Sequence, residues 1–284
     1  MTRPTIVVCT LLLAACGDRA GGGAINGKLT LRYRPPAGAV YGYDVEQRTT
    51  MNMEAGPFTG ATGGGQQLTT HLHVTQAVTG PVPGGIEVRL TFDSARLEAP
   101  GMTPRQVKGL HSTMLFDERQ QVVRSGLDTA RGAGPPPELA AAIAAGVKAM
   151  SFALPQEPVG PGDSWTVATA LPIGELPGVS GAGASRTTLT VKQFSVAGGD
   201  TTALLAVETT FPGDPIRLTV VGQPATLRLS GGLSGEQVFS LTRGAVVRSA
   251  MKGTMRINLT GGPLGGGGKG MVMSAATETT VRLR

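Results

Sequence analysis

Apolar and polar residues alternate along much of this chain, and the alternation predicts β-strands that each bury one face. The period of two is strict over 86–93 (IEVRLTFD) and returns over 226–229 and 251–259. Segments rich in glycine and proline separate these stretches, at 83–85, 198–200, 231–232 and 261–270. The last of them predicts a hairpin loop whose second strand runs over 271–283.

Two segments depart from this pattern and predict helices. Pro135–Pro137 precedes Glu138 and an alanine-rich stretch that continues to about Met150. Proline suits the first turn of a helix, glutamate complements its positive end, and alanine has the highest helix propensity. One apolar stripe then contains Leu139, Ile143, Val147 and Met150. A second helix is predicted from about Thr103 to Ser112, and both helices would cover the concave face of a curved sheet.

The chain repeats its own pattern after roughly 120 residues. Pro36, Gly38, Tyr43 and Val45 match Pro158, Gly160, Trp165 and Val167 at one constant separation. Segments 69–76, 88–92 and 119–125 then match 187–193, 207–211 and 243–249 in the same order. We therefore predict a first β unit over 31–134, a bridging helix over 135–153 and a second β unit over 154–284, both in one domain.

These patterns define the expected fold class. The 43 glycines and 20 prolines exceed ordinary usage and favour strands joined by many turns. We predict a mainly β protein with a curved antiparallel sheet or incomplete barrel, built from two similar halves, with one or two helices packed on it. At the level of the fold, this form resembles periplasmic lipoprotein carriers and their lipid-binding relatives.

The N-terminus is a separate unit. One positive residue, Arg3, precedes an apolar run from Ile6 to Ala15, which is too short to span a bilayer. The run ends in Leu13-Ala14-Ala15-Cys16, which resembles the signal peptide of bacterial lipoproteins. The resemblance implies that residues 1–15 are removed, that the Cys16 thiol carries a diacylglycerol and that the new amine is acylated too.

The same resemblance implies a location. Two or three acyl chains hold a protein on a membrane far more firmly than one chain does. An aspartate directly after the lipid-bearing cysteine resembles a signal that retains lipoproteins at the inner membrane. In this chain that position is Gly17, so we expect the protein at the outer membrane, facing the periplasm. Residues 16–30 predict a flexible tether. Cys9 would leave with the signal peptide, so the mature chain would have no free thiol and no disulfide.

A second resemblance covers the start of the second unit. Residues 154–165 (LPQEPVGPGDSW) resemble a P-x-x-P-V-G-x-G-x-x-W motif of uncharacterised secreted bacterial families, and no activity comes with it. The prolines and glycines predict a rigid turn into a strand, and we expect Trp165 to anchor that strand in the core.

Charge and composition exclude some partners. The net charge is +6, yet the basic residues are scattered and aromatic residues make up only 4% of the chain. Nucleic-acid-binding proteins cluster their charges and interleave aromatic platforms, so we predict no nucleic-acid partner. A dispersed basic surface suits anionic phospholipid or lipopolysaccharide, or solvation alone.

Candidate chemistry is sparse. His71 and His73 share one side of a predicted strand, but their neighbours Leu72 and Val74 mark the other side as buried, so both histidines should face solvent. His111 has no recognisable ligand context, and Ser164 and Asp163 point oppositely on a strand. We therefore predict no metal, no cofactor and no catalytic residues.

The methionines are the remaining candidates for a site. They form three pairs, each on one face of a predicted strand: Met51 with Met53, Met251 with Met255, and Met271 with Met273. Methionine is flexible and polarisable, so such faces suit acyl chains, although methionine also fills gaps in ordinary cores. Our leading hypothesis is a non-catalytic, membrane-anchored envelope lipoprotein that binds a hydrophobic ligand such as lipid. The alternatives are a structural or protein-interaction module of the envelope and, third, an enzyme.

Overall fold

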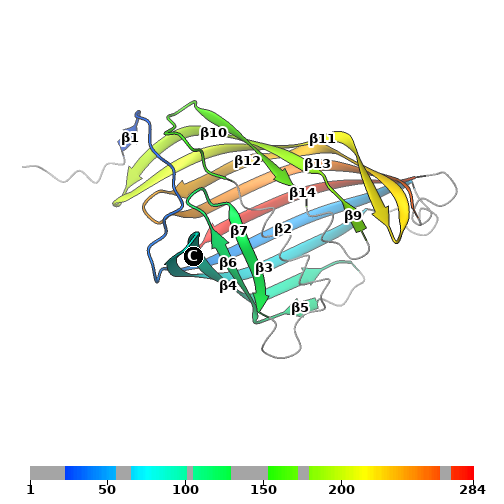
Figure 1. The fold of residues 1–284 in the computed structure, drawn as a ribbon, viewed down its shortest axis with the longest axis horizontal. Coiled ribbons are helices and arrows are strands. Elements are labelled where there is room, and N and C mark those ends of the chain that lie inside the picture. The colour runs from blue at the N-terminus through cyan, green and yellow to red at the C-terminus, as the bar shows by residue number, and fades with distance from the viewer. Residues whose placement is uncertain (1–22, 56–64, 101–104, 129–152, 172–178, 263–269) are drawn as a thin grey trace, which may run out of the picture.

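The computed structural model describes residues 23–55, 65–100, 105–128, 153–171, 179–262 and 270–284. These residues form a single antiparallel sheet of 14 strands (Figure 1). The strands are β1 (Gly23–Ile25), β2 (Val40–Ala55), β3 (Gln66–Val82), β4 (Gly85–Glu98), β5 (Arg105–Val107), β6 (Leu110–Phe116), β7 (Val122–Asp128), β8 (Ser164–Ala170), β9 (Val179–Gly181), β10 (Ala184–Ala197), β11 (Asp200–Val220), β12 (Gln223–Ser240), β13 (Ala245–Gly261) and β14 (Met271–Leu283).

The sheet is curved (Figure 1), and its strand order shows that it does not close into a barrel, which confirms the predicted fold class. The order is β1-β10-β11-β12-β13-β14-β2-β3-β4-β6-β7, with β5 beside β4, β8 beside β10 and β9 beside β11. The predicted hairpin over the last glycine-rich loop is present, because β13 and β14 pair along 12 residues from Arg248↔Arg282 to Leu259↔Met271.

The sheet consists of two similar halves. Strands β2-β3-β4-β6-β7 form one antiparallel meander, and β8-β10-β11-β12-β13 form another with the same order. Strand β14 then joins them, because it pairs with β13 on one side and β2 on the other.

Irregularities in the two halves fall at matching places. The register shifts between Val78 and Gly80 in β3 and between Val191 and Gln193 in β10. The backbone carbonyl of each valine also accepts a hydrogen bond from a glycine that precedes the first strand of its half. Gly38 N, before β2, donates to Val78 O at 2.9 Å, and Gly162 N, before β8, donates to Val191 O at 2.8 Å.

The register corrects the predicted matching of the repeats. Gly38 corresponds to Gly162 rather than to Gly160, and Trp165 to Tyr41 rather than to Tyr43. The expected match between 122–125 and 246–249 is confirmed, because both segments pair across an equivalent bulge, at Leu115/Phe116 and at Val238/Phe239.

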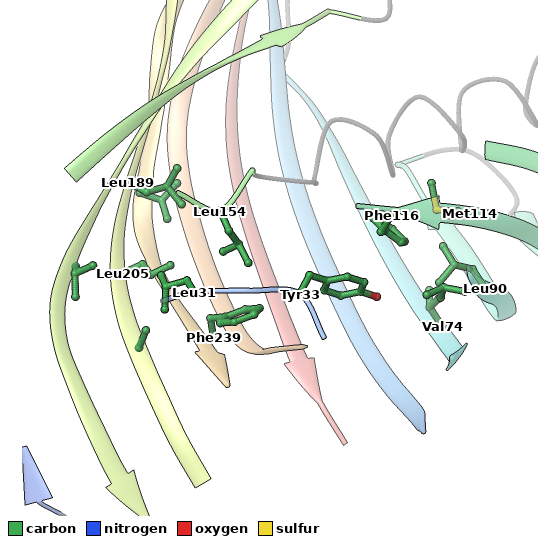
Figure 2. Close-up of a cluster of buried hydrophobic side chains, with 14 of the residues drawn as sticks. Leu31, Tyr33, Val74, Leu90, Met114, Phe116, Leu154, Leu189, Leu205 and Phe239 are labelled. Atoms are coloured by element: carbon green, nitrogen blue, oxygen red, sulfur yellow. The ribbon is translucent and has the colours of Figure 1, made fainter. Parts of the chain in front are cut away.

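The main core fills the concave side of the sheet. Leu205 of β11 and Val74 of β3 belong to one buried cluster although four strands lie between β11 and β3 in the sheet order, so the sheet must curl round the cluster (Figure 2). Leu31 and Tyr33 lie between the two halves of the curved sheet (Figure 2). The centroid of the Tyr33 ring is 5.2 Å from that of the Phe116 ring.

Two irregular segments bridge the open side of the sheet at the end occupied by this core. Leu29 and Val159 exchange both backbone hydrogen bonds, at 2.8 and 3.0 Å. Tyr33 N donates to Glu118 O at 2.8 Å, which ties segment 29–33 to the turn between β6 and β7. Segment 153–159 also receives Trp165, whose indole Nε1 donates to Ala153 O at 2.8 Å while its ring packs against the core.

The helix predicted over 103–112 is wrong. Residues 105–107 form β5, and 110–116 form β6, which pairs with β4. In β6, Leu110, Ser112 and Met114 are buried on one side. The period of two therefore dominates this segment, and the pairing with β4 satisfies its backbone. The helix predicted over 135–150 and the lipidation site at Cys16 lie outside the described residues. No helix within the described parts of the chain is long and apolar enough to cross a membrane.

Candidate ligand-binding face

The structure brings all six candidate methionines together on one face of three neighbouring strands. Met51 and Met53 lie on β2, Met251 and Met255 on β13, and Met271 and Met273 on β14. Met53 is directly opposite Met273, and Ala275 is opposite both Met51 and Met255. We call these six residues the methionine face.

The methionine face lies on the concave side of the sheet. Gly235 is opposite Met251 and shares its side of β12 with Phe239, which is fully buried in the main core. Met51 and Met53 lie toward the end of β2 that is remote from Tyr41 and Tyr43, which pack near the bridged end. The main core therefore occupies one end of the concave side, and the methionine face extends from the edge of that core, against which Met251 packs, toward the other end.

The methionine face is less covered than the core beside it. Phe239, Val207 and Leu205 are 0% exposed, whereas all six methionines have intermediate exposure. Smaller apolar neighbours continue the surface toward Leu218, Ala225 and Leu259, which form a second buried cluster with Met271 packed against it. Apolar area on this half of the concave side is therefore accessible.

Glycines bring the backbones of β12 and β13 close together beside the methionines. Gly231 and Gly235 of β12 are directly opposite Met255 and Met251, and Gly253 of β13 is opposite Leu233. A Cβ at any of these three glycines would collide with the backbone of the neighbouring strand. The close approach is typical of a sharply bent sheet, and the same glycines project no side chain into the concavity.

The convex face has the opposite character. His73 Nδ1 is 2.6 Å from Asp44 Oδ1, the Arg284 Nε is 3.3 Å from the same carboxylate oxygen, and Arg48 pairs with Glu46. A hollow of about 350 Å³ lies here, lined by both histidines and by charged residues of β2 and β14. The histidines therefore lie on the polar outer face, as predicted, although His71 is half-buried there.

Two of the other residues considered for chemistry, His111 and Asp163, have structural partners. His111 Nδ1 is 3.1 Å from Thr91 Oγ1, and Ser164 is an exposed residue of β8. Asp163 Oδ2 accepts a hydrogen bond from Gly160 N at 3.0 Å and pairs with Lys28 at 3.1 Å. These two contacts lower the pKa of the Asp163 carboxyl. Within the described ranges, no group of three or more histidine, cysteine, aspartate or glutamate residues could hold a metal ion.

A hollow of about 510 Å³ lies at the bridged end, between Pro35, Pro81, Ile86 and Glu118. It contains none of the residues predicted to form a site.

Sequence reasoning found the methionines but missed the features around them. The close backbone approach at Gly231, Gly235 and Gly253 depends on which strands are neighbours, which the alternation does not reveal. Segment 29–33 carried a usable signal, because Leu29, Leu31 and Tyr33 alternate with polar residues.

The chain matches no protein-family model, and no curated protein shows significant similarity to its sequence.

Proposed function

We propose that this protein is a non-catalytic envelope lipoprotein that binds a hydrophobic ligand on the methionine face. In this proposal Cys16 carries the acyl anchor, residues 16–30 are the tether, and the folded body faces the periplasm from the outer membrane. The observation that carries the proposal is the convergence of six methionines on one accessible concave surface.

Methionine supports such a role through its flexibility. Its unbranched side chain and polarisable sulfur allow one surface to adapt to acyl chains of different shape. The glycines at 231, 235 and 253 project no side chain beside the methionines, and they let the backbones of β12 and β13 approach closely. Exposed apolar surface of this kind costs solubility unless something covers it, so its retention favours a binding role.

A binding assay with matched variants tests the proposal. The probe is N-phenyl-1-naphthylamine, an uncharged dye that fluoresces in apolar surroundings, added to the full-length protein after extraction and removal of bound lipid. Met51→Asp and Met255→Asp place a charge on the concave side, whereas Thr50→Asp and Thr254→Asp place it on the convex side of the same strands.

We expect saturable dye binding in the wild type and in both threonine variants, and at least about tenfold weaker binding in the methionine variants. Circular dichroism and thermal unfolding identify any variant that fails to fold. Absence of dye binding to the folded wild type, or equal loss in concave and convex variants, would overturn the proposal.

The anchor is tested separately. Cys16→Ser should move the protein from the membrane fraction to the soluble fraction, because no thiol remains at position 16 to receive the lipid. Native mass spectrometry of the wild type should show the mass of the mature chain plus acyl groups. An unmodified Cys16 in a freely soluble product would remove the envelope location from the proposal while leaving the ligand test intact.

A further inference from the structure

The middle of the concave side carries a belt of uncharged polar residues. We define the polar belt as Gln47, Thr49, Thr70, Thr277 and Thr279. Gln47 is opposite both Thr70 and Thr279, and Thr49 is opposite Thr277. The Thr49 and Thr277 hydroxyl oxygens are 3.2 Å apart, and Gln47 Nε2 donates to Thr49 Oγ1 at 3.4 Å.

The belt directly adjoins the methionine face. Along the inner side of β2, the order is Val45, Gln47, Thr49, Met51 and Met53. On β14 the two threonines of the belt are followed, in the same direction across the sheet, by Ala275 and then Met273. Four residues of extended strand separate Thr49 from Met53, which corresponds to about 13 Å.

Charged residues are segregated to the other face of the same strands. In β12, β13, β14, β3 and the part of β2 up to Met53, which together contain the belt and the methionine face, every charged residue and histidine has the parity of the convex side. The register places them there: Asp44, Glu46, Arg48, His71, His73, Arg228, Glu236, Arg248, Lys252, Arg256, Glu278 and Arg282. The side chains that the paired residues of these five strands project to the concave side are therefore apolar or polar and uncharged.

We infer that the ligand is an uncharged amphiphile, whose hydroxyl, amide or ester group lies on the polar belt and whose apolar chain lies along the methionine face. This inference rests on the proposed function, because it specifies the chemistry of the same surface. Threonine hydroxyls and the Gln47 amide both donate and accept hydrogen bonds, so they satisfy a neutral polar group. A carboxylate or phosphate would lose much of its hydration there without gaining an opposite charge.

The belt also explains why the polar positions interrupt an otherwise apolar face. If residues 47, 49, 277 and 279 were apolar, the apolar surface would continue from the main core to the methionines. The apolar chain of a ligand would then bind equally well at any position along the strands. Hydrogen-bonding groups at one position along the strands give the ligand a preferred position, because only there does its polar group find hydrogen-bond partners.

Competition against the same dye tests the inference. Decanol and decanoate have chains of equal length, and at about pH 8 decanoate is ionised while decanol is neutral. We expect decanol to displace the dye at a concentration at least about tenfold lower than decanoate does. Gln47→Lys should strengthen binding of decanoate, whereas Thr50→Lys, which adds the same charge to the convex side of β2, should not.

The outcomes separate the two proposals. If the dye does not bind to the folded protein, the proposed function fails and the inference fails with it. If the dye binds and decanoate competes as well as decanol, the surface binds apolar chains but the inference of an uncharged ligand is overturned. Equal effects of Gln47→Lys and Thr50→Lys would also overturn it, because the belt would then not contact the polar group.

Discussion

Gly235 of β12 lies directly opposite Met251 of β13, and a Cβ at position 235 would lie only 2.9 Å from the Met251 Cα. Side chains do not pack at that distance, so the strands must separate if glycine is replaced. The bend of the sheet beside the methionine face therefore depends on this glycine.

Gly235→Ala should lower the free energy of unfolding by about 1–3 kcal/mol, the usual cost of forcing extra volume into a packed site. Urea unfolding measures the change. Gly126→Ala is the matched control, because Gly126 also lies within a strand, β7, but has no heavy atom within 4 Å of a Cβ. The control should be neutral or slightly stabilising. Equal destabilisation by the two substitutions would contradict the account of the bend.

Segment 29–33 should contribute strongly to stability. Leu31 is 0% exposed and lies between the two halves of the sheet (Figure 2). Leu31→Ala should therefore cost about 2–5 kcal/mol of unfolding free energy. Val123→Ala is the control, since Val123 is 56% exposed, and its effect should stay within about 0.5 kcal/mol. A small effect at Leu31 would mean that the segment only lies on the surface of the core.

The hairpin between β11 and β12 contains a strained residue. Val221 has a φ of 49° and the following Gly222 a φ of 77°, in a two-residue turn between Val220 and Gln223. A branched side chain is unfavourable at positive φ, whereas asparagine tolerates it and is common in such turns. Val221→Asn should raise the free energy of unfolding by about 1 kcal/mol.

Thermal unfolding should show this as a rise in Tm of roughly 2–4 °C for a protein of this size. Val221 is 75% exposed, so little packing is lost. Val40→Asn, at another exposed position (65% exposed) at the start of β2, should bring no increase. A Tm unchanged or lowered by Val221→Asn would show that the positive φ carries no strain.

Stability should fall at acid pH through Asp163. The hydrogen bond from Gly160 N and the contact with Lys28 hold the pKa of this carboxyl below that of an ordinary aspartate. A carboxyl whose folded pKa is depressed stabilises the fold above the unfolded pKa, and the contribution is lost as pH falls through the folded value. Urea unfolding at about pH 7 and about pH 3 should therefore show a smaller loss for Asp163→Asn than for the wild type. Equal losses would mean that the two contacts do not act on the ionised carboxyl.

Much of the fold was predictable because alternation is a local property. The period of two in 86–93 and 251–259 identifies strands wherever they pair. The sequence pattern matches Gly38 to Gly160, two residues before its true counterpart Gly162, because proline and glycine recur within a few positions in both turns. The hydrogen bonds of Val78 and Val191, which define the true correspondence, are invisible in the sequence.

The site was predictable only in parts. Each methionine pair was placed on one strand face from its spacing, but its neighbours depend on the topology. Strand β14 inserts between β13 and β2, which places Met273 opposite Met53, 220 positions earlier in the chain. The polar belt was missed for the same reason, since Thr49 and Thr277 acquire their relationship only through that pairing.

The most direct test of the account is photo-crosslinking with a long-chain alcohol that carries a diazirine near its apolar end, followed by peptide mapping of the labelled protein. We predict labels on Met51, Met53, Met255 or Met273 and their concave-side neighbours, with unlabelled alcohol competing for them. Labels confined to the convex side, on residues such as Arg48, Lys252 or Glu278, or labels insensitive to competition, would contradict a ligand-binding role for the methionine face.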